Sequence, residues 1–346
     1  MLAKGFAAGQ PVAGLSEATA RSHRAEPAVS VIICVFTEQR WQSILRALDS
    51  LTTQSHPPVE VIVVVDCNES LKHRLEIAFP DLRVIANAHA RGLSGGRNTG
   101  IESARGEIVA FIDDDARAHK EWVAALLAAY ADDSVIGVGG LVLPEWSHDL
   151  APAWFPAEFL WVVGCSYAGQ PLTLGEVRNV LGANMSFRRT AFDRVGLFNS
   201  AIGRNATETR PLGCEETELC IRIRSEFPDS RILYEPLAVV YHRVDRSRAT
   251  WRYFRERCYA EGVSKELVAE SVGTSAALSS ERRFATRTLP RAAWGELSRL
   301  ARGAGVEHLS RLAALTVGFS WTLAGYVNGR AGRASRRCVR TQDGTR

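Results

Sequence analysis

The sequence predicts an α/β fold with a mostly parallel central sheet, helices on both faces of the sheet and a basic helical region at the C-terminal end. The apolar, β-branched run from Val29 to Phe36 is typical of a strand buried on both faces, and the run from Val59 to Asp66 repeats it. Between the two runs, apolar residues recur at helical spacing, at Trp41, Ile44, Leu45, Leu48 and Leu51. A strand, a helix and a strand in this order form a βαβ unit, which indicates a parallel sheet.

The next segment repeats the scheme. A short strand from Leu82 to Asn87 is followed by the glycine-rich stretch GLSGGRNTG, which leads into a helix, and then by a strand in EIVAFID that ends at Asp113. In open α/β sheets, ligands bind beyond the carboxyl ends of the strands. Asp66 and Asp113 both lie at such ends, so we expect the binding site at this edge.

Further elements extend the sheet. We predict a helix from Trp122 to Tyr130 and a strand from Val135 to Leu143. The aromatic segment from Pro144 to Tyr167 has no clear periodicity, and we interpret it as a loop or lid. Its aromatic side chains could stack on a sugar or a lipid, but we expect most of them to pack in the core.

The second half of the domain is predicted to contain two more strands and three helices. The strands run from Asn179 to Arg188, with a break at a glycine, and from Arg231 to Val244. Helices are expected from Thr190, in CEETELCIRIRSEF with its acidic residues in the first turn, and from Ser247 to Gly262.

Charge divides the chain into parts. From Ser280 onward there are thirteen arginines and no lysine against four acidic residues, although the net charge of the whole chain is only +4. We therefore expect a flexible lead-in over residues 1–28, a catalytic domain over 29–270 and a basic helical C-terminal region with a flexible tail over 271–346. The basic region either forms a helical subdomain with a disordered tail or attaches to an anionic membrane surface.

The sequence predicts a cytoplasmic location. The first 28 residues lack the continuous apolar core of a secretory signal, and the longest apolar stretch, from Leu312 to Val327, is shorter than a membrane span. The seven cysteines are scattered and contain no Cys-x-x-Cys pair, as in proteins of a reducing compartment. The basic C-terminal region leaves peripheral attachment at the inner face of the cell membrane as an alternative.

Three consecutive aspartates, Asp113, Asp114 and Asp115, follow a buried strand, where they repel one another. Such a triplet can be a solvated turn or a helix cap. At the ligand-binding edge of a parallel sheet, it can instead hold Mn²⁺ or Mg²⁺, which prefer carboxylate oxygens and would bind a diphosphate at the same time. His242, which ends an apolar strand, is either structural or a further metal ligand.

Other polar residues have both a structural and a functional interpretation. Asp66 can cap the turn that follows its strand or accept hydrogen bonds from a nucleobase. Arg97, in GLSGGRNTG, offers planar donors suited to phosphate, although the motif is neither a Walker loop nor a dinucleotide fingerprint. The acidic stretch GCEETEL is an ordinary helix start, or it supplies a general base whose pKa is raised by burial and by neighbouring acids.

The order of these motifs resembles that of the family 2 glycosyltransferases, whose fold is the Rossmann-like A-type nucleotide-diphospho-sugar transferase fold. The resemblance is carried by VSVIICVF, VIVVVDCNES, RGLSGGRNTGIESARGEIVAFIDDDA, LGANMSFRRTAFDRVGLFN, GCEETELCIRI and VVYHRV, and it extends over residues 29–262. It implies that the aspartate triplet is the family's D-x-D motif, in which Asp113 faces the ribose and Asp115 holds the metal.

The resemblance also implies roles for other positions. Glu216 is expected to be the catalytic base, with Glu215 as the alternative because the family usually has Glu-Asp here. Nucleotide-sugar contacts are expected from Thr37, Glu38, Asp66, Arg97, Asn98, Asp113 and Asp114. The sugar and acceptor side is expected to include Gly182, Ala183 and Asn184, and the metal ligands are expected to be Asp115 and His242.

The implied activity is an inverting, hexosyltransferase-type reaction that moves a sugar from a nucleotide-diphospho-sugar to an acceptor hydroxyl, on a glycan or a lipid-linked acceptor of the cell envelope. Two alternatives are a nucleotidyltransferase of related fold and a non-catalytic nucleotide-sugar-binding protein. No nucleic-acid-binding module accompanies the basic tail. The sequence does not define the donor sugar, the nucleobase of the donor or the oligomeric state.

Overall fold

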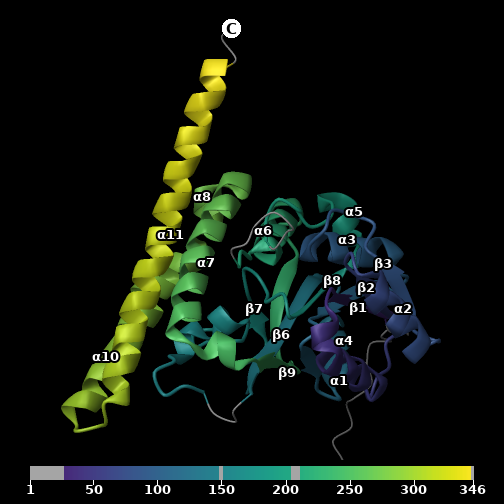
Figure 1. Cartoon of the computed structure of the whole chain (residues 1–346), viewed down its shortest axis with the longest axis horizontal. Coiled ribbons are helices and arrows are strands. Elements are labelled where there is room, and N and C mark those ends of the chain that lie inside the picture. Colours follow the sequence, from purple (N-terminus) through teal and green to yellow (C-terminus); the bar gives the residue numbers. More distant parts are fainter. Residues whose placement is uncertain (1–26, 148–150, 204–210, 344–346) are drawn as a thin grey trace, which may run out of the picture.

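The computed structural model describes residues 27–147, 151–203 and 211–343, with side chains up to residue 332. In this part of the chain, one nine-stranded sheet has the order β3-β2-β1-β4-β8-β6-β9-β5, and β7 pairs with β9. Figure 1 shows the sheet at the centre of the molecule, with a long helical arm at one side. The strands are β1 (Val29–Val35), β2 (Glu60–Val65), β3 (Arg83–Ala86), β4 (Ile108–Ile112), β5 (Ala116–Ala118), β6 (Val135–Trp146), β7 (Gly175–Glu176), β8 (Asn184–Arg188) and β9 (Arg231–Val244).

The helices alternate with the strands in the first half of the chain and follow them in the second. The helices that surround the sheet are η1 (Glu38–Arg40), α1 (Trp41–Thr52), α2 (Glu69–Ala78), α3 (Leu93–Ser103), α4 (Trp122–Ala129), η2 (Ala157–Val163), α5 (Arg189–Val195), α6 (Glu215–Glu226) and η3 (Arg246–Ala249). The C-terminal helices are α7 (Trp251–Val272), α8 (Thr274–Ala277), α9 (Ser279–Arg283), the π-helical turn η4 (Phe284–Thr288), α10 (Leu289–Ala301) and α11 (Glu307–Asp343).

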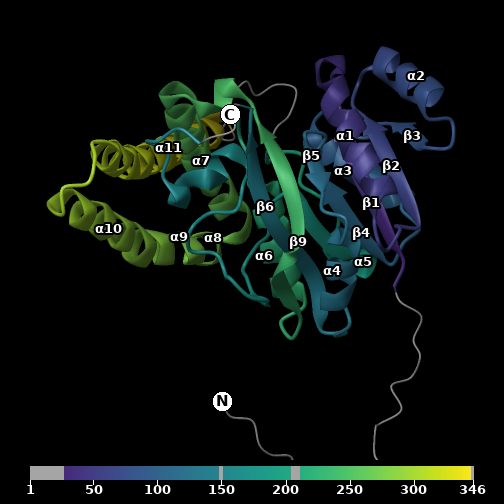
Figure 2. The ribbon, with the colours of Figure 1, turned by 90° about the horizontal axis from the view of Figure 1, so that it is seen from below.

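The predicted α/β fold with helices on both faces is confirmed. Alternate residues of β1 point to opposite faces of the sheet, so that Val31 and Ile33 belong to one apolar core and Ile32 to the other. The first core is closed by α1, α2 and α4, and the second by α3, α5 and α6. Figure 2 shows these helices on either side of the twisted sheet.

The sheet is more mixed than the sequence suggested. Strands β3, β2, β1 and β4 are parallel to one another, but β8 runs antiparallel to both of its neighbours, β4 and β6. β8 is also shorter than the predicted strand and begins only at Asn184. Apolar content identifies a buried strand but not the direction in which it enters the sheet, which depends on its neighbours.

The close packing of α3 against β1 depends on Gly100. A Cβ atom at Gly100 of α3 would lie 2.6 Å from Ile32 of β1. Any larger residue would therefore push α3 away from the sheet. This contact holds α3, which carries the predicted site residues Arg97 and Asn98, close to β1.

The aromatic segment that we interpreted as a loop or lid is largely core. Strand β6 continues through Pro144 to Trp146, and the 3-10 helix η2 follows. Phe155 and Phe159 are buried in an apolar cluster with Phe254 of α7. Trp154 and Trp161 are partly buried against the same cluster, as expected for most of these aromatic side chains.

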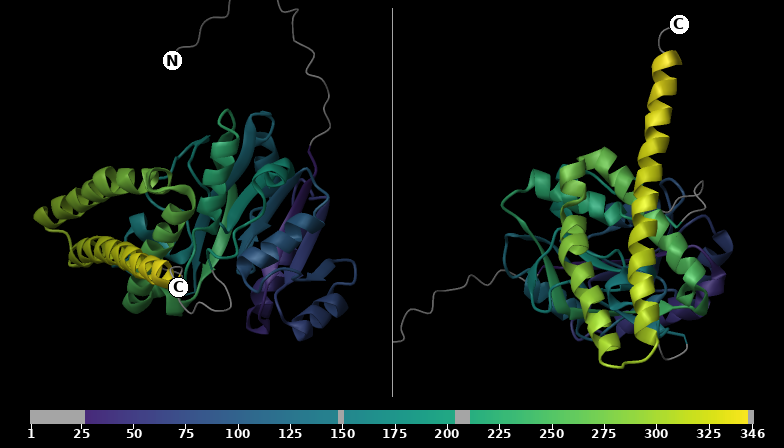
Figure 3. Two further views of the ribbon diagram at one scale, coloured as in Figure 1. Left: turned by 90° about the horizontal axis from the view of Figure 1, so that it is seen from above. Right: turned by 90° about the vertical axis from the view of Figure 1, so that its left-hand side faces the viewer.

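The C-terminal region is helical, as predicted, and α7 continues ten residues beyond the predicted end at Gly262. Ala314 and Leu315 of α11 are buried in the cluster that contains Phe254 of α7, so that α11 packs along α7. Figure 3 shows α10 and α11 as a hairpin on the outside of the molecule. None of the helices that the structure describes combines the length and the apolar character that crossing a bilayer requires.

Candidate active site

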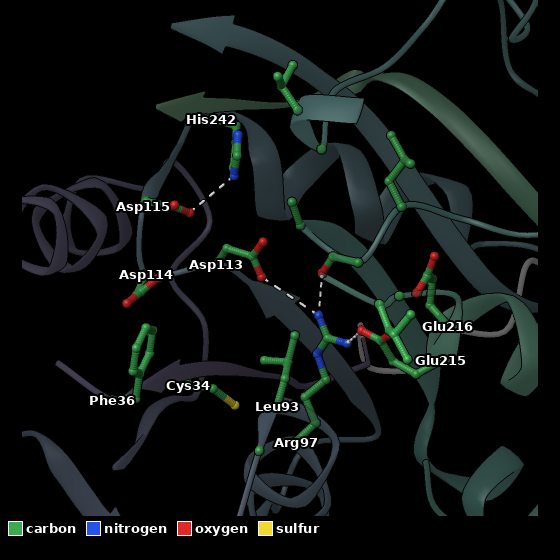
Figure 4. Close-up of a pocket in the computed structure, with 18 of the residues that line it drawn as sticks. Cys34, Phe36, Leu93, Arg97, Asp113, Asp114, Asp115, Glu215, Glu216 and His242 are labelled. Atoms are coloured by element: carbon green, nitrogen blue, oxygen red, sulfur yellow. Dashed lines mark hydrogen bonds and ion pairs between the residues drawn. The ribbon is translucent and has the colours of Figure 1, made fainter. Parts of the chain in front are cut away.

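A cavity of about 460 Å³ lies at the carboxyl ends of β1, β2 and β4, at the edge where the sequence predicts a ligand. The first residues of α3 and α6 form one wall, and η2 and α7 close it from the other side. Figure 4 shows that two acidic groups face each other across this cavity. One group contains the aspartate triplet with His242, and the other contains Glu215 and Glu216.

The first group is assembled by the register of two strands. β5 begins at Ala116, directly after the triplet, and pairs antiparallel with β9 so that Ala116 lies opposite His242. This register brings His242 Nε2 to within 3.1 Å of Asp115 Oδ1. One ligand atom each from Asp113, Asp115 and His242 lies within 4.8 Å of the other two.

These three residues fit a divalent cation. Two carboxylates and one imidazole are oxygen and nitrogen donors of the kind that Mn²⁺ accepts, and carboxylates alone also suit Mg²⁺. The side chain of Asp114 is turned away from the other two aspartates (Figure 4) and is bonded to Arg40 Nη1 at 2.5 Å. The triplet therefore offers two carboxylates to a metal and one to a protein cation.

Two arginines that we did not predict compensate the triplet. Arg40 contacts both Asp114 and Asp115, the latter at 3.2 Å, and Arg248 Nη2 lies 3.2 Å from Asp115 Oδ2. Arg40 follows the first strand by only a few residues, as a site residue often does. Arg248 is separated from Asp115 by 133 residues, and no local signal in the sequence connects them.

These contacts and burial shift the pKa values of Asp115 and Asp114 in opposite directions. Burial acts to raise the pKa of Asp115, but His242, Arg40 and Arg248 together hold it well below its usual range. Burial raises the pKa of Asp114 to about 7, against the effect of Arg40. Burial alone would lower the pKa of His242, yet the neighbouring Asp115 raises it to about 10.

Arg97 connects the two acidic groups. Its guanidinium is buried and lies 2.8 Å from Glu215 Oε1 and 3.7 Å from Asp113 Oδ1. It also donates to the carbonyl of Gly182 at 3.3 Å. Arg97 therefore forms a bridge in the cavity wall between the carboxylates of Glu215 and Asp113.

The second acidic group lies at the start of α6. Cys214 has a left-handed backbone with φ 72°, and α6 begins at the next residue, so that Glu215 and Glu216 both face the cavity. Glu215 Oε2 is buried and has no hydrogen-bond partner among the described residues. Glu216 forms no ion pair with a described residue, and burial and Glu215 raise its pKa to about 8.

Some of the other predicted residues line the cavity and some do not. Asp66, Gly182 and Ala183 line the cavity. The carboxylate of Asp66 accepts hydrogen bonds from Asn87 Nδ2 at 2.7 Å and from the backbone amide of Gly92 at 3.0 Å. The residue predicted to bind the base, at the end of β2, therefore holds the loop between β3 and α3 in place.

Four predicted residues do not line the cavity. Thr37 caps η1 by accepting from the amide of Gln39, and Glu38 pairs with Arg74 at the surface. The side chain of Asn98 bonds with the backbone of Phe198 in both directions. Asn184 is fully buried, where it accepts from Trp122 and donates to two backbone carbonyls.

Residues of α7 and η2 complete the cavity, and sequence patterns did not indicate them. They include Trp161, Val162, Tyr253 and Arg257. Arg257 is held by Glu261 at 3.1 Å, one turn further along α7. Their sequence neighbourhoods show only helical and aromatic character, which is equally typical of core residues.

The fold and this site together define an α/β enzyme with an acidic, candidate metal-binding centre at the ligand-binding edge of the sheet. The sequence profile described as Glycosyl transferase family 2 matches residues 30–196. Over 244 residues, the chain is 34% identical to the glucosyl-dolichyl phosphate glucuronosyltransferase of Haloferax volcanii, which covers 69% of this chain and 77% of that protein. The chain belongs to glycosyl transferase family 2 and is a glycosyltransferase.

Solved structures agree on the fold. The mannosyltransferase PcManGT of Pyrobaculum calidifontis, in complex with GDP-Man and Mn²⁺, is similar with a TM-score of 0.52 and 18% identity, over 86% of this chain and 87% of that one. GalNAc-T7, with UDP, GalNAc and Mn²⁺, gives a TM-score of 0.50 and 16% identity, over 76% of this chain and 58% of that one. The A-type fold expected from the sequence is thereby confirmed.

Proposed function

We propose that the protein transfers a sugar from a nucleotide-diphospho-sugar to an acceptor hydroxyl, with inversion and with Mn²⁺ or Mg²⁺ as cofactor. The observation that carries this proposal is the placement in one cavity of a candidate metal-binding group and of Glu216, a carboxylate with no ion-pair partner among the described residues. The two groups are suited to the two ends of the reaction, since a diphosphate leaves at one and a proton is removed at the other.

The donor would bind along the strand ends. Asp66 would accept hydrogen bonds from the base, because it lines the cavity at the end of β2. Asp113, Asp115 and His242 would hold the cation, which neutralises charge on the departing diphosphate. The cavity provides cationic groups for the phosphates in Arg40 and Arg248, which in this structure contact the aspartates instead.

The chemical step is one displacement. Glu216 accepts the proton of the acceptor hydroxyl, the hydroxyl oxygen forms a bond to the anomeric carbon, and the bond from that carbon to the diphosphate oxygen breaks. Glu216 is favoured over Glu215 because Glu215 is paired with Arg97, whereas a pKa of about 8 makes Glu216 a stronger base than an ordinary carboxylate. Attack opposite the leaving group gives inversion without a covalent sugar intermediate.

The acceptor we propose is lipid-linked and belongs to a cell-envelope glycan. The Haloferax volcanii relative acts, by its name, on glucosyl-dolichyl phosphate. An acceptor of this chemical class would require the enzyme to work at a membrane surface, peripherally and from the cytoplasmic side. Family membership argues against the nucleotidyltransferase alternative, and turnover of a nucleotide sugar would exclude a role limited to binding.

The experiment that tests this proposal is a thermal-shift panel of nucleotide-diphospho-sugars, each with Mn²⁺, with Mg²⁺ or with chelator. A ligand that binds only the folded state raises the melting temperature by mass action. We expect one donor to stabilise the protein, and chelator to remove most of the shift. A folded sample that responds to no donor in the presence of either metal would contradict the proposal.

A further inference from the structure

Exposed apolar side chains gather on the C-terminal hairpin of α10 and α11. Among the described residues, more than half of the large hydrophobic side chains that are exposed lie on these two helices and the loop between them. Elsewhere such side chains are scattered, as is normal for a soluble surface. The set, here called the hairpin surface, comprises Trp294, Leu297, Val306, Leu309, Phe319, Trp321, Leu323 and Val327.

The hairpin surface is exposed because α11 uses its opposite face to pack on α7. A Cβ atom at Gly325 would lie 2.0 Å from the carbonyl oxygen of Tyr259, so the two helices approach too closely to admit a larger residue. Leu309, Leu323 and Val327 are spaced by 14 and 4 residues and therefore share the outer face of the helix. No charged residue occurs between Arg311 and Arg330, so this face is an uncharged stripe, and Figure 3 shows that α11 lies on the outside of the molecule.

The charge around the stripe is mostly positive. Residues 279–332 contain eight arginines, no lysine and three glutamates. Two of these glutamates are neutralised within the protein, since Glu281 pairs with Arg178 and Lys265, and Glu296 pairs with Arg299. A second copy of the chain would bring arginines against arginines, whereas anionic lipid headgroups have the complementary charge.

The position of the hairpin relative to the cavity fits a lipid-linked acceptor. Val162 and Val163 of η2 line the cavity and belong to the same apolar cluster as Ala314 and Leu315 of α11. Tyr253 of α7, the helix on which α11 packs, also lines the cavity. η2 and α7 therefore connect the wall of the cavity with the hairpin, so that a membrane in contact with the hairpin would lie close to the site of transfer.

We propose that the hairpin surface docks on an anionic membrane. Apolar side chains of α10 and α11 enter the headgroup region and the arginines contact lipid phosphates, with the helices lying in the plane of the interface. This inference deepens the proposed function, because it names the surface from which a lipid-linked acceptor is reached, and it rests on that function only for this purpose.

The test is flotation of the full chain with vesicles of phosphatidylcholine, alone or mixed with phosphatidylglycerol. We expect co-flotation with the mixed vesicles only, weakened by salt because electrostatic attraction is screened. The double variant Leu323→Glu, Val327→Glu should reduce the bound fraction roughly tenfold or more, because it places charge in the apolar stripe. Arg291→Gln should reduce binding by roughly fivefold, the share of one arginine near the surface.

The matched control is the double variant Ile77→Glu, Leu172→Glu, which adds the same charge at apolar side chains that are 69% and 93% exposed outside the hairpin. It should float like the unmodified protein. The proposal is overturned if the unmodified protein stays with the unbound fraction, if both double variants float equally, or if light scattering shows that Leu323→Glu, Val327→Glu only dissociates a dimer.

Donor binding separates this proposal from the proposed function. The hairpin variants should keep the melting-temperature shift caused by nucleotide sugar and metal, which shows that they are folded and that the cavity is intact. Loss of flotation with that shift retained supports docking through the hairpin surface. Absence of the shift in the unmodified protein would contradict the glycosyl-transfer proposal and leave the flotation result valid.

Discussion

The two acidic groups of the cavity are built from the same kind of side chain but are treated in opposite ways. At the metal-type end, Asp115 is surrounded by His242, Arg40 and Arg248, and its pKa is held low. At the other end, Glu216 has no ion pair with a described residue, and its pKa is raised to about 8. In the mechanism we propose, the carboxylate that must stay ionised to hold a cation is compensated, and the one that must take a proton has no such partner among the described residues.

The difference teaches that neighbouring charges, more than residue type, define what each carboxylate can do. Arg97 sharpens the contrast, because it neutralises Glu215 and leaves the adjacent Glu216 under the influence of burial. Without Arg97, the carboxylates of Asp113 and Glu215 would face each other across the cavity without the cation that lies between them. We therefore regard Arg97 as the residue that keeps the two ends electrostatically separate.

The largest expected effect on turnover is at Asp115, the carboxylate that is surrounded by cationic side chains. Asp115→Ala should lower turnover at least about 1000-fold, because charge on the leaving diphosphate would no longer be neutralised. Steady-state kinetics with the donor identified by thermal shift would measure it. The exposed Asp49→Ala provides the control and should be unaffected. Near-normal turnover of folded Asp115→Ala would show that Asp115 does not hold a metal ion that the reaction needs.

The second largest effect is expected at Glu216, at the other side of the cavity. Glu216→Gln should lower kcat by roughly 100- to 10 000-fold, the usual contribution of a general base, and leave donor binding in the thermal-shift assay unchanged. Glu215→Gln should instead weaken donor binding, because it frees Arg97 and changes the charge beside Asp113. If the effects of the two substitutions were exchanged, Glu215 would be the base.

The pH dependence sharpens the same contrast. Because the pKa of Glu216 is raised to about 8, the residue is mostly protonated below that pH and inactive as a base. We expect kcat/KM to rise roughly tenfold per pH unit up to about pH 8 and then to level off. Glu216→Gln should lose this rise. A profile of the unmodified enzyme that is flat down to about pH 6 would show that the carboxylate is not shifted.

The smallest effect is on stability and concerns Glu281, a carboxylate outside the cavity that pairs with two cationic side chains. Although burial raises the pKa of Glu281, Lys265 and Arg178 lower it to about 2. The folded-state pKa is below the ordinary value of 4.5, so its stabilisation is complete above pH 4.5 and is lost as the pH falls toward 2. Glu281→Gln should cost about 3 kcal/mol in the free energy of unfolding at neutral pH.

Chemical denaturation at neutral pH would measure this cost, and turnover per folded molecule should stay unchanged because Glu281 lies outside the cavity. Glu307→Gln is the matched control, since its partner His308 is 3.7 Å away and the carboxylate is 42% exposed. An exposed pair of this kind contributes little to stability. Equal costs for both substitutions would mean that cationic compensation is not what stabilises buried carboxylates here.

The sequence by itself determined the features that are local in the chain. Strand β4 and the aspartate triplet are adjacent, so the apolar run and the acidic end could be predicted together, as could Glu215 and Glu216 at the start of α6. The fold class followed from periodicity, because a strand buried on both faces has no polar alternation.

Tertiary structure alone decided which polar side chains reach the cavity. Asn98 and Asn184 carry suitable groups, but backbone atoms that would otherwise stay unpaired in the interior use them. Arg248 meets Asp115 because η3 follows β9, whose register with β5 brings His242 to the triplet. Spacing in the sequence determines a face of a helix or strand, whereas contact across 133 residues depends on strand order and register, which no local pattern encodes.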